Sequence, residues 1–159
     1  DVDADSNCNG IFGVDGDGKS YEETFCSGEN APMGIAILGD SATAHFSLPP
    51  QYLNARRFPA LDNLTHALEL LSNEADWPQC SWSTGFRSTE GCPLSTVPMA
   101  SLYQRLFEQN HCIHRDFQNL GVNGARADSL ANPIEQSLAR SQTKDVPLLV
   151  FVAVIGNDV

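Results

Sequence analysis

The sequence has few basic residues: nine Lys and Arg stand against 20 Asp and Glu, which gives a net charge of −11 at pH 7. Proteins that bind nucleic acid carry basic surface that displaces phosphate counterions, so this balance argues against a nucleic-acid partner. Long apolar runs are also lacking, because the longest one, 148–155, is far shorter than the roughly 20 residues that a membrane-spanning helix needs. We therefore expect neither a nucleic-acid partner nor a transmembrane segment.

Low-complexity tracts are absent too. The 159 residues are 42% hydrophobic and 18% charged, a composition that excludes a disordered or fibrous chain and fits one globular domain or part of one. The sequence starts at Asp1, without Met and without an apolar signal region. We expect a mature product, a cleaved piece or the ordered part of a longer protein.

The five cysteines form no Cys-x-x-Cys pair, so disulfides are a better interpretation than a zinc site of the ribbon or finger type. Cys80 and Cys92 lie within the stretch 76–98, which is rich in Pro and Gly, and we expect them to bridge this loop. Cys8 and Cys26 could close a loop near the N-terminus. The odd number leaves one thiol free or paired with a companion chain. Together with the glycosylation sequon at Asn63, this cysteine usage favours a secreted or lumenal protein.

The excess of acidic residues is concentrated near the N-terminus, where residues 1–30 contain eight acidic side chains and a single base, Lys19. This stretch shows neither helical nor strand periodicity, and we predict an irregular loop. Crowded carboxylates repel one another unless a cation joins them. Residues 1–30 therefore indicate either a segment that binds a hard metal ion or a disordered acidic arm.

Within this segment the oxygen-bearing side chains of Asp5, Asn7 and Asn9 alternate, and Gly10 holds the sixth place of a calcium loop counted from Asp5. The twelfth place is Gly16 rather than the usual Glu, so the loop is atypical and needs ligands from further along the chain. The candidate ligands are Asp1, Asp3, Asp5, Asn7, Asn9, the Ile11 carbonyl, Asp15, Asp17 and Glu22. We expect them to bind one to three calcium ions that rigidify and dock the segment.

Short apolar runs alternate with amphipathic stretches from residue 31 on. The runs 34–38, 116–122 and 148–155 predict strands, the last of them buried on both faces. Helical spacing predicts two helices, one through Leu61, Leu64, Leu68 and Leu71 and one through Met99, Leu102, Tyr103, Leu106 and Phe107. A third helix is predicted to start at Asn132 as the capping residue before Pro133 and to continue through Leu138. This order predicts an α/β fold in which helices cover a parallel sheet.

A small polar cluster follows each predicted strand: Gly39-Asp40-Ser41, Asn123-Gly124 and Gly156-Asn157-Asp158. Ligands bind at the carboxyl ends of the strands in such sheets, so the three clusters are expected to meet. A serine in the turn after a strand can act as a nucleophile, and glycine and asparagine amides nearby can donate to the oxyanion that forms on an ester carbonyl. Together the clusters predict an acyl-transfer site.

These clusters resemble the first three blocks of the SGNH (GDSL-type) hydrolases, in which Ser, Gly and Asn share the site. The resemblance is most specific to the acyloxyacyl hydrolase family. It is carried, in the same order along the chain, by residues 5–11 (DSNCNGI), 37–46 (ILGDSATAHF) with 49–50, 110–116 (NHCIHRD), 123–125 and 155–159. It implies a calcium-binding segment in residues 1–30 and, in residues 31–159, the N-terminal part of a three-layer α/β/α sandwich with a flavodoxin-like parallel sheet.

The resemblance also implies a function. Enzymes of this family are lipases that remove secondary fatty acyl chains from the lipid A of lipopolysaccharide and also act on phospholipids. By the resemblance, Ser41 is the nucleophile, and the backbone amides of Ser41 and Gly124 form the oxyanion hole with the Asn157 side chain.

Two features of the family are missing from the 159 residues. One is the Asp-x-x-His that supplies the general base, without which the serine is not activated. None of the four histidines, His45, His66, His111 and His114, lies in such a motif, and we expect them to be structural. The other is the saposin-like domain that precedes the hydrolase. We expect a companion or longer chain to carry the rest of the hydrolase; the alternative is a catalytically inactive calcium-binding structural or lipid-binding module on a hydrolase scaffold.

Overall fold

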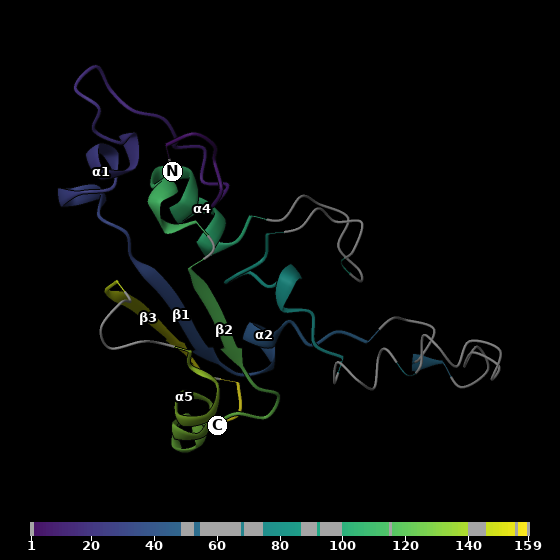
Figure 1. Cartoon of the computed structure of the whole chain (residues 1–159). Helices are drawn as coiled ribbons and strands as arrows, with labels where there is room; N and C mark the ends of the chain where they lie inside the picture. The colour runs from purple at the N-terminus through teal and green to yellow at the C-terminus, as the bar shows by residue number, and fades with distance from the viewer. Residues whose placement is uncertain are drawn as a thin grey trace.

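The computed structural model describes residues 2–48, 53–54, 68, 75–86, 92, 100–114, 116–139, 146–154 and 156–158. Its centre is a sheet of three parallel strands in the order β2-β1-β3 (Figure 1). The strands are β1 Gly34–Gly39, β2 Phe117–Gly121 and β3 Leu148–Ala153. The α/β fold class with a parallel sheet is confirmed, and the sheet is open at both edges among the described residues.

β1 forms the middle of the core because all six of its residues are buried. Its alternate side chains Ile35 and Ile37 point to one face, where they pack with Tyr103 of helix α4 (Leu102–Gln109). Ser101 caps α4 by accepting a hydrogen bond from the Gln104 amide at 3.0 Å. The helical stripe predicted to begin at Met99 thus yields a helix from Leu102, and Met99 lies outside the described residues.

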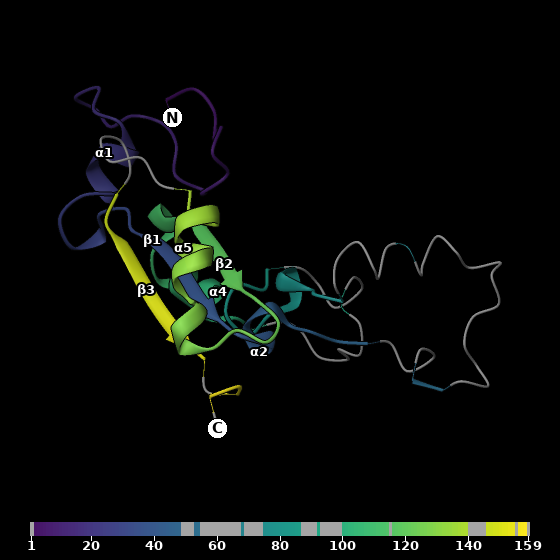
Figure 2. The same cartoon turned by 90° about the horizontal axis from the view of Figure 1, so that it is seen from below.

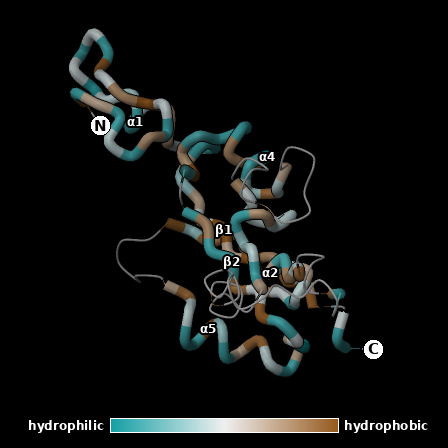
Figure 3. The backbone as a smooth tube through the Cα atoms, turned by 90° about the vertical axis from the view of Figure 1, so that its right-hand side faces the viewer, coloured by the Kyte–Doolittle hydropathy of each residue, from teal (hydrophilic) through white to brown (hydrophobic). Residues whose placement is uncertain are grey.

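Helix α5 (Ala131–Ser137) lies on the opposite side of the strands from α4 (Figures 1 and 3). The side-chain amide of Gln118 on β2 donates to the Ala139 carbonyl at 2.8 Å and accepts from the Ala139 amide at 2.9 Å, which fixes the end of this segment to the sheet. The helices and the sheet therefore form three layers. Seen from below, α5 lies in front of the strands (Figure 2).

Two details of the predicted elements are wrong. β3 is a strand, but it is not buried on both faces: it lies at the edge of the three strands, and Val150 and Val152 are 47% and 59% exposed. The start of α5 is displaced, because the 3-10 turn Ala127–Ser129 leads directly into the helix through Leu130, whose backbone is already helical. Asn132 is consequently the second residue of α5 rather than its cap.

The segment 2–30 is more regular than predicted. Helix α1 (Tyr21–Phe25) is capped by the Ser20 hydroxyl, which accepts from the Glu23 amide at 3.1 Å, and the 3-10 turn Gly28–Asn30 follows it. The prediction of an irregular loop is wrong over these residues. The signal was present as a serine three residues before a glutamate, the pattern of a helix start.

Two disulfides cross-link the described chain. Cys80–Cys92 is confirmed, whereas the suggested pairing of Cys8 with Cys26 is wrong because Cys26 is bonded to Cys112. Cys8 is exposed and is the described cysteine that forms neither of these bonds. Cys112 lies in the 3-10 turn His111–Ile113 that follows α4, so the Cys26–Cys112 bond joins the N-terminal segment to the helix layer.

Other predictions fall on residues that are not described. The helix predicted through Leu61, Leu64 and Leu71 lies outside the described residues, as do the sequon at Asn63 and His66; Leu68 is described and is exposed. No helix among the described residues is long and apolar enough to cross a membrane.

Candidate functional site

Ser41 begins the short helix α2 (Ser41–Ala44) immediately after β1. Asp40 caps this helix, since one of its carboxylate oxygens accepts from the Ala42 amide at 2.9 Å. The other oxygen accepts from the Gly156 amide at 3.0 Å. The buried Asp40 carboxylate therefore joins the first polar cluster to the third.

The second and third clusters are joined as well. The Asn157 side-chain amide donates to the Ala125 carbonyl at 3.0 Å, and the Asp158 carboxylate accepts from the Ala127 amide at 3.1 and 3.2 Å. Gly124 has φ +76°, the positive value expected for it in the turn after β2. The parallel register places the ends of the strands level, with Gly39 opposite both Gly121 and Ala153. All three clusters thus gather at one edge of the sheet.

A cavity of about 300 Å³ opens at this edge. It is lined by Asp40, Ser41, Ala42, Thr43, Trp82, Ala153, Gly156 and Asn157. Ser41 and Asn157 share the cavity, whereas Gly124 is not among its lining residues. Because Asn157 has two amide hydrogens and Ala125 takes one, a donor is left for a ligand in the cavity.

Two glycines allow α2 to lie directly on the strands. A Cβ atom added at Gly121 would come within 2.5 Å of the Ala44 backbone nitrogen, and one added at Gly39 would overlap the Thr43 side chain. No side chain can be accommodated between β2 and the helix at this point. The close approach positions Ser41 relative to the ends of β1 and β2.

The sequence does not predict the hydrogen bonds that hold α2 in place. The Thr43 carbonyl accepts hydrogen bonds from the Ser81 hydroxyl at 2.7 Å and from the Asn119 side-chain amide at 2.9 Å. Asn119 also donates to the Thr84 hydroxyl at 2.8 Å and accepts from the Gly121 amide at 2.9 Å. Ser81 and Thr84 come from the segment 75–86, which lies beside α2 (Figure 1). Isolated Ser, Thr and Asn residues in distant segments give no signal that their side chains will contact one another.

The described histidines lie elsewhere. His45 ends α2 in the left-handed conformation at φ +57°, and its burial lowers its pKa below the ordinary value of 6.5. The rings of His111 and His114 pack on Phe107, with centroids 4.6 and 5.0 Å from the Phe107 ring. None of these three lines the Ser41 cavity, and the described part of the chain places no imidazole there.

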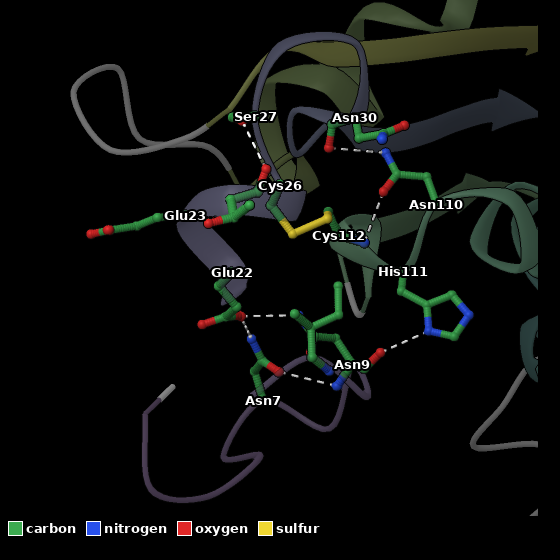
Figure 4. The surroundings of a disulfide bond; sticks show 12 residues. Asn7, Asn9, Glu22, Glu23, Cys26, Ser27, Asn30, Asn110, His111 and Cys112 are labelled. Carbon is green, nitrogen blue, oxygen red and sulfur yellow. Dashed lines mark hydrogen bonds between the residues drawn. A yellow bond between two sulfur atoms is a disulfide. The ribbon is translucent and has the colours of Figure 1, made fainter. Parts of the chain in front are cut away.

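Several candidate calcium ligands come together in the N-terminal segment (Figure 4). The Asp5 carboxylate accepts from the backbone amides of Asn9 and Gly10, each at 3.0 Å. The Asn7 and Asn9 side-chain amides both donate to the Glu22 carboxylate, which brings α1 against the loop. The Nδ1 atom of His111 lies 2.9 Å from the Asn9 carbonyl, so the same loop also contacts the helix layer.

Other candidate ligands are not part of this cluster. Asp15 closes a separate turn by accepting from the amides of Asp17 and Lys19, each at 2.9 Å, and Asp1 lies outside the described residues. No group of three or more His, Cys, Asp or Glu side chains within the described ranges is arranged to hold a metal ion. The cluster of Asp5, Asn7, Asn9 and Glu22 nevertheless offers carboxylate and amide oxygens, the donors that Ca²⁺ prefers. Its residue types therefore fit that ion.

Fold and site together define an α/β protein with a serine at the carboxyl edge of a parallel sheet, in a cavity shared with an asparagine side chain. No family model matches the chain. Over its whole length the chain is 48% identical to acyloxyacyl hydrolase of Homo sapiens, 47% to that of Mus musculus and 45% to that of Oryctolagus cuniculus. The similarity to acyloxyacyl hydrolases inferred from the sequence motifs is confirmed. The chain spans about 27% of the length of each of these relatives.

Proposed function

We propose that this chain carries the nucleophile and the oxyanion-binding groups of a serine ester hydrolase of the acyloxyacyl hydrolase type. The observation that carries the proposal is the cavity in which Ser41 lies with Asn157, at the edge where all three polar clusters meet. The relatives are acyloxyacyl hydrolases, which supports the hydrolysis of an ester as the reaction.

In the proposed reaction the Ser41 oxygen attacks the ester carbonyl carbon and gives up its proton to a general base. The carbonyl oxygen becomes an oxyanion, held by the backbone amides of Ser41 and Gly124 and by the Asn157 side chain. The ester C–O bond then breaks, the proton passes to the leaving alcohol, and water releases the acyl group from Ser41 in a second addition and elimination. The hydrogen bond between Asn157 and Ala125 orients the side-chain amide for this role.

The described residues do not supply the general base of the reaction. No Asp-x-x-His occurs among the 159 residues, and no described histidine lines the Ser41 cavity. We propose that the base comes from a longer or companion chain that carries the rest of the hydrolase. The proposed substrates are the secondary fatty acyl esters of lipopolysaccharide lipid A, and phospholipids.

A serine-directed fluorophosphonate tests the proposal on the full-length protein. We expect it to label Ser41, and Ser41→Ala to abolish labelling, while the exposed Ser6→Ala variant labels like the parent. Removal of an oxyanion donor in Asn157→Ala should lower kcat about 100- to 1,000-fold. Absence of labelling in the full-length protein would contradict the proposal.

The second candidate is a catalytically inactive calcium-binding structural or lipid-binding module. The observation that favours it is the cluster of Asp5, Asn7, Asn9 and Glu22, whose oxygens suit Ca²⁺ without any part in catalysis. It predicts lipid or calcium binding without turnover of any ester. Mass spectrometry of the native protein, with and without reduction, separates the two, because the first candidate requires more polypeptide than 159 residues.

We also propose that the N-terminal segment binds calcium through Asp5, Asn7, Asn9, Ile11 and Glu22, with Asp1, Asp3, Asp15 and Asp17 as further candidate ligands. The ion would fix a segment in which Asn9 is the sole buried residue among positions 2–30. Calcium at about 100 times its dissociation constant should stabilise the protein by about 2.7 kcal/mol. Thermal unfolding with calcium and with chelator measures this, and Asp5→Asn with Glu22→Gln should remove the difference, whereas Glu29→Gln should keep it. Equal midpoints in calcium and chelator would count against the site.

The proposed compartment is the secretory pathway, as a secreted or lumenal protein. Its support is the pair of disulfides in the described chain, since such bonds persist in oxidising compartments. A disulfide-linked companion chain is proposed as well, and the exposed thiol of Cys8 is the described cysteine not engaged within this chain. The mass measurement with and without reduction tests it, because such a chain would be released by the reductant.

A further inference from the structure

Trp82 is a large apolar side chain that forms one wall of the Ser41 cavity and is 45% exposed. Its two neighbours in the chain, Ser81 and Ser83, are by contrast fully buried, with 0% exposure each. A buried polar residue on each side of an exposed indole is the reverse of what burial of apolar surface alone would produce. The exposure of the Trp82 indole is therefore not explained by the stability of the fold and indicates a role in binding.

Hydrogen bonds fix the backbone on both sides of Trp82. The Ser81 hydroxyl donates to the Thr43 carbonyl at 2.7 Å and lies 2.8 Å from the Ser83 hydroxyl. The carbonyls of Trp82 and Ser83 accept from the first amides of α4, those of Leu102 and Tyr103, at 2.8 and 2.9 Å.

Trp82 and its two neighbours lie inside the loop that the Cys80–Cys92 disulfide closes. A loop that is anchored to α2, to α4 and through a disulfide loses little further conformational freedom when a ligand binds its exposed side chain.

The cavity has two kinds of wall. Asp40, Ser41 and Asn157 are polar residues of the lining, whereas Trp82, Ala42 and Ala153 are apolar ones. An ester of a fatty acid has the same division, because its carbonyl needs hydrogen-bond donors and its acyl chain needs apolar surface. The indole is the largest apolar side chain in that lining.

We propose that Trp82 binds the acyl chain of the ester whose carbonyl lies at Ser41, and that it sets the preference for long acyl chains. This inference deepens the proposed function and rests on it for the position of the carbonyl. It assigns Trp82 a role in substrate selection, separate from the acid–base and oxyanion chemistry.

Binding is tested without catalysis in the full-length protein carrying Ser41→Ala. A long-chain fatty acid brominated on its chain quenches the fluorescence of an indole that it touches. We expect the acid to quench this protein, and most of the quenching to disappear when Trp82→Phe is added. The matched control is Trp77→Phe, since the Trp77 indole donates to the Ser47 carbonyl at 3.1 Å and does not line the cavity, and it should leave the quenching in place.

Selectivity is tested with nitrophenyl laurate and nitrophenyl acetate. Trp82→Ala should lower kcat/KM for the laurate about tenfold and for the acetate by less than about twofold, with the loss mainly in KM. Trp82→Phe, which keeps an aromatic wall, should recover most of the activity on laurate. A merely structural role would lower both esters alike.

The outcomes separate the two proposals. If Ser41 is labelled but quenching and the laurate-to-acetate ratio are the same with and without Trp82, the role of Trp82 is wrong and the proposed function stands. If the brominated acid quenches Trp82 but no ester is cleaved and Ser41 is not labelled, the chain-binding role stands and the hydrolase function fails. Quenching that persists in Trp82→Phe and vanishes in Trp77→Phe would also overturn the role of Trp82.

Discussion

The sheet and the N-terminal segment are held together by different forces. Around β1 the structure is ordered by apolar burial, with Ile35 and Ile37 enclosed between strands and α4. In residues 2–30 Asn9 is the one buried residue, while Phe12 and Phe25 are more than half exposed. That segment is ordered by polar contacts and by the Cys26–Cys112 bond (Figure 4). One region follows from hydrophobicity, and the other depends on cross-links and charge.

This difference predicts which changes each region tolerates. A region built on burial is sensitive to lost volume and insensitive to ions, because apolar burial does not depend on charge. A region built on polar contacts should respond to reduction, chelation and acid, and hardly to the loss of a methyl group.

The largest effect is expected from the disulfide that joins the regions. Cys26 and Cys112 are 86 residues apart, and a bond closing a loop of that length removes about 4 to 5 kcal/mol of chain entropy from the unfolded state. The double variant Cys26→Ser/Cys112→Ser should lose that much free energy of unfolding in denaturant titrations. It should also release the N-terminal segment, measured as faster amide hydrogen exchange in residues 2–30.

Cys80–Cys92 supplies the matched control, since it closes a loop of 12 residues. Its removal should cost about 3 kcal/mol and leave exchange in residues 2–30 unchanged. If both pairs accelerate exchange in the N-terminal segment equally, the two regions are not held separately.

The next effect tests burial in the sheet. Ile37→Ala removes a side chain that is 0% exposed and should cost about 3 kcal/mol. Val152→Ala, on the exposed side of the edge strand β3, should cost less than about 0.5 kcal/mol. Denaturant midpoints at equal slope measure both, and similar losses would mean that β3 is as buried as its composition predicted.

A smaller effect is expected at the glycine beneath α2. Gly121→Ala places a Cβ within 2.5 Å of the Ala44 nitrogen and should cost about 2 kcal/mol while displacing Ser41. Gly16→Ala is the control in the N-terminal segment, where no atom lies within 4 Å of the added Cβ. Unfolding free energies and the rate of fluorophosphonate labelling together check this prediction; a neutral Gly121→Ala with normal labelling would refute the close packing.

The sequence predicts the sheet well because apolar runs report burial directly. It places β1 and β2 almost to the residue, and the parallel arrangement then requires the clusters at Ser41, Gly124 and Asn157 to meet at one edge. It errs at β3 because a Val-rich run looks alike in a central and an edge strand. Whether such a run becomes a central or an edge strand depends on the strands beside it, which the run itself does not specify.

The polar parts of the molecule are harder to predict. Ser81 is buried and Asn119 half-buried because α2, β2 and the loop 75–86 come together around the Thr43 carbonyl, and nothing local to either residue reveals this. The partner of Cys26 is equally hidden, since 86 residues separate it from Cys112. Polar contacts between distant segments are products of the fold, whereas apolar periodicity is a property of the sequence.

The smallest effect is expected in the pH dependence of stability and comes from His45, at the end of α2 beside the sheet. Burial lowers the pKa of His45 below 6.5, so as the pH falls the unfolded chain binds a proton before the folded one does. Stability contributed by the neutral imidazole is therefore present above pH 6.5 and is lost as the pH falls through the folded pKa. His45→Asn, which tolerates the left-handed backbone at this position, should flatten that part of the curve of unfolding free energy against pH. Every other side chain is the same in the two proteins, so the difference between the two curves isolates His45, and parallel curves would show that its burial has no energetic consequence.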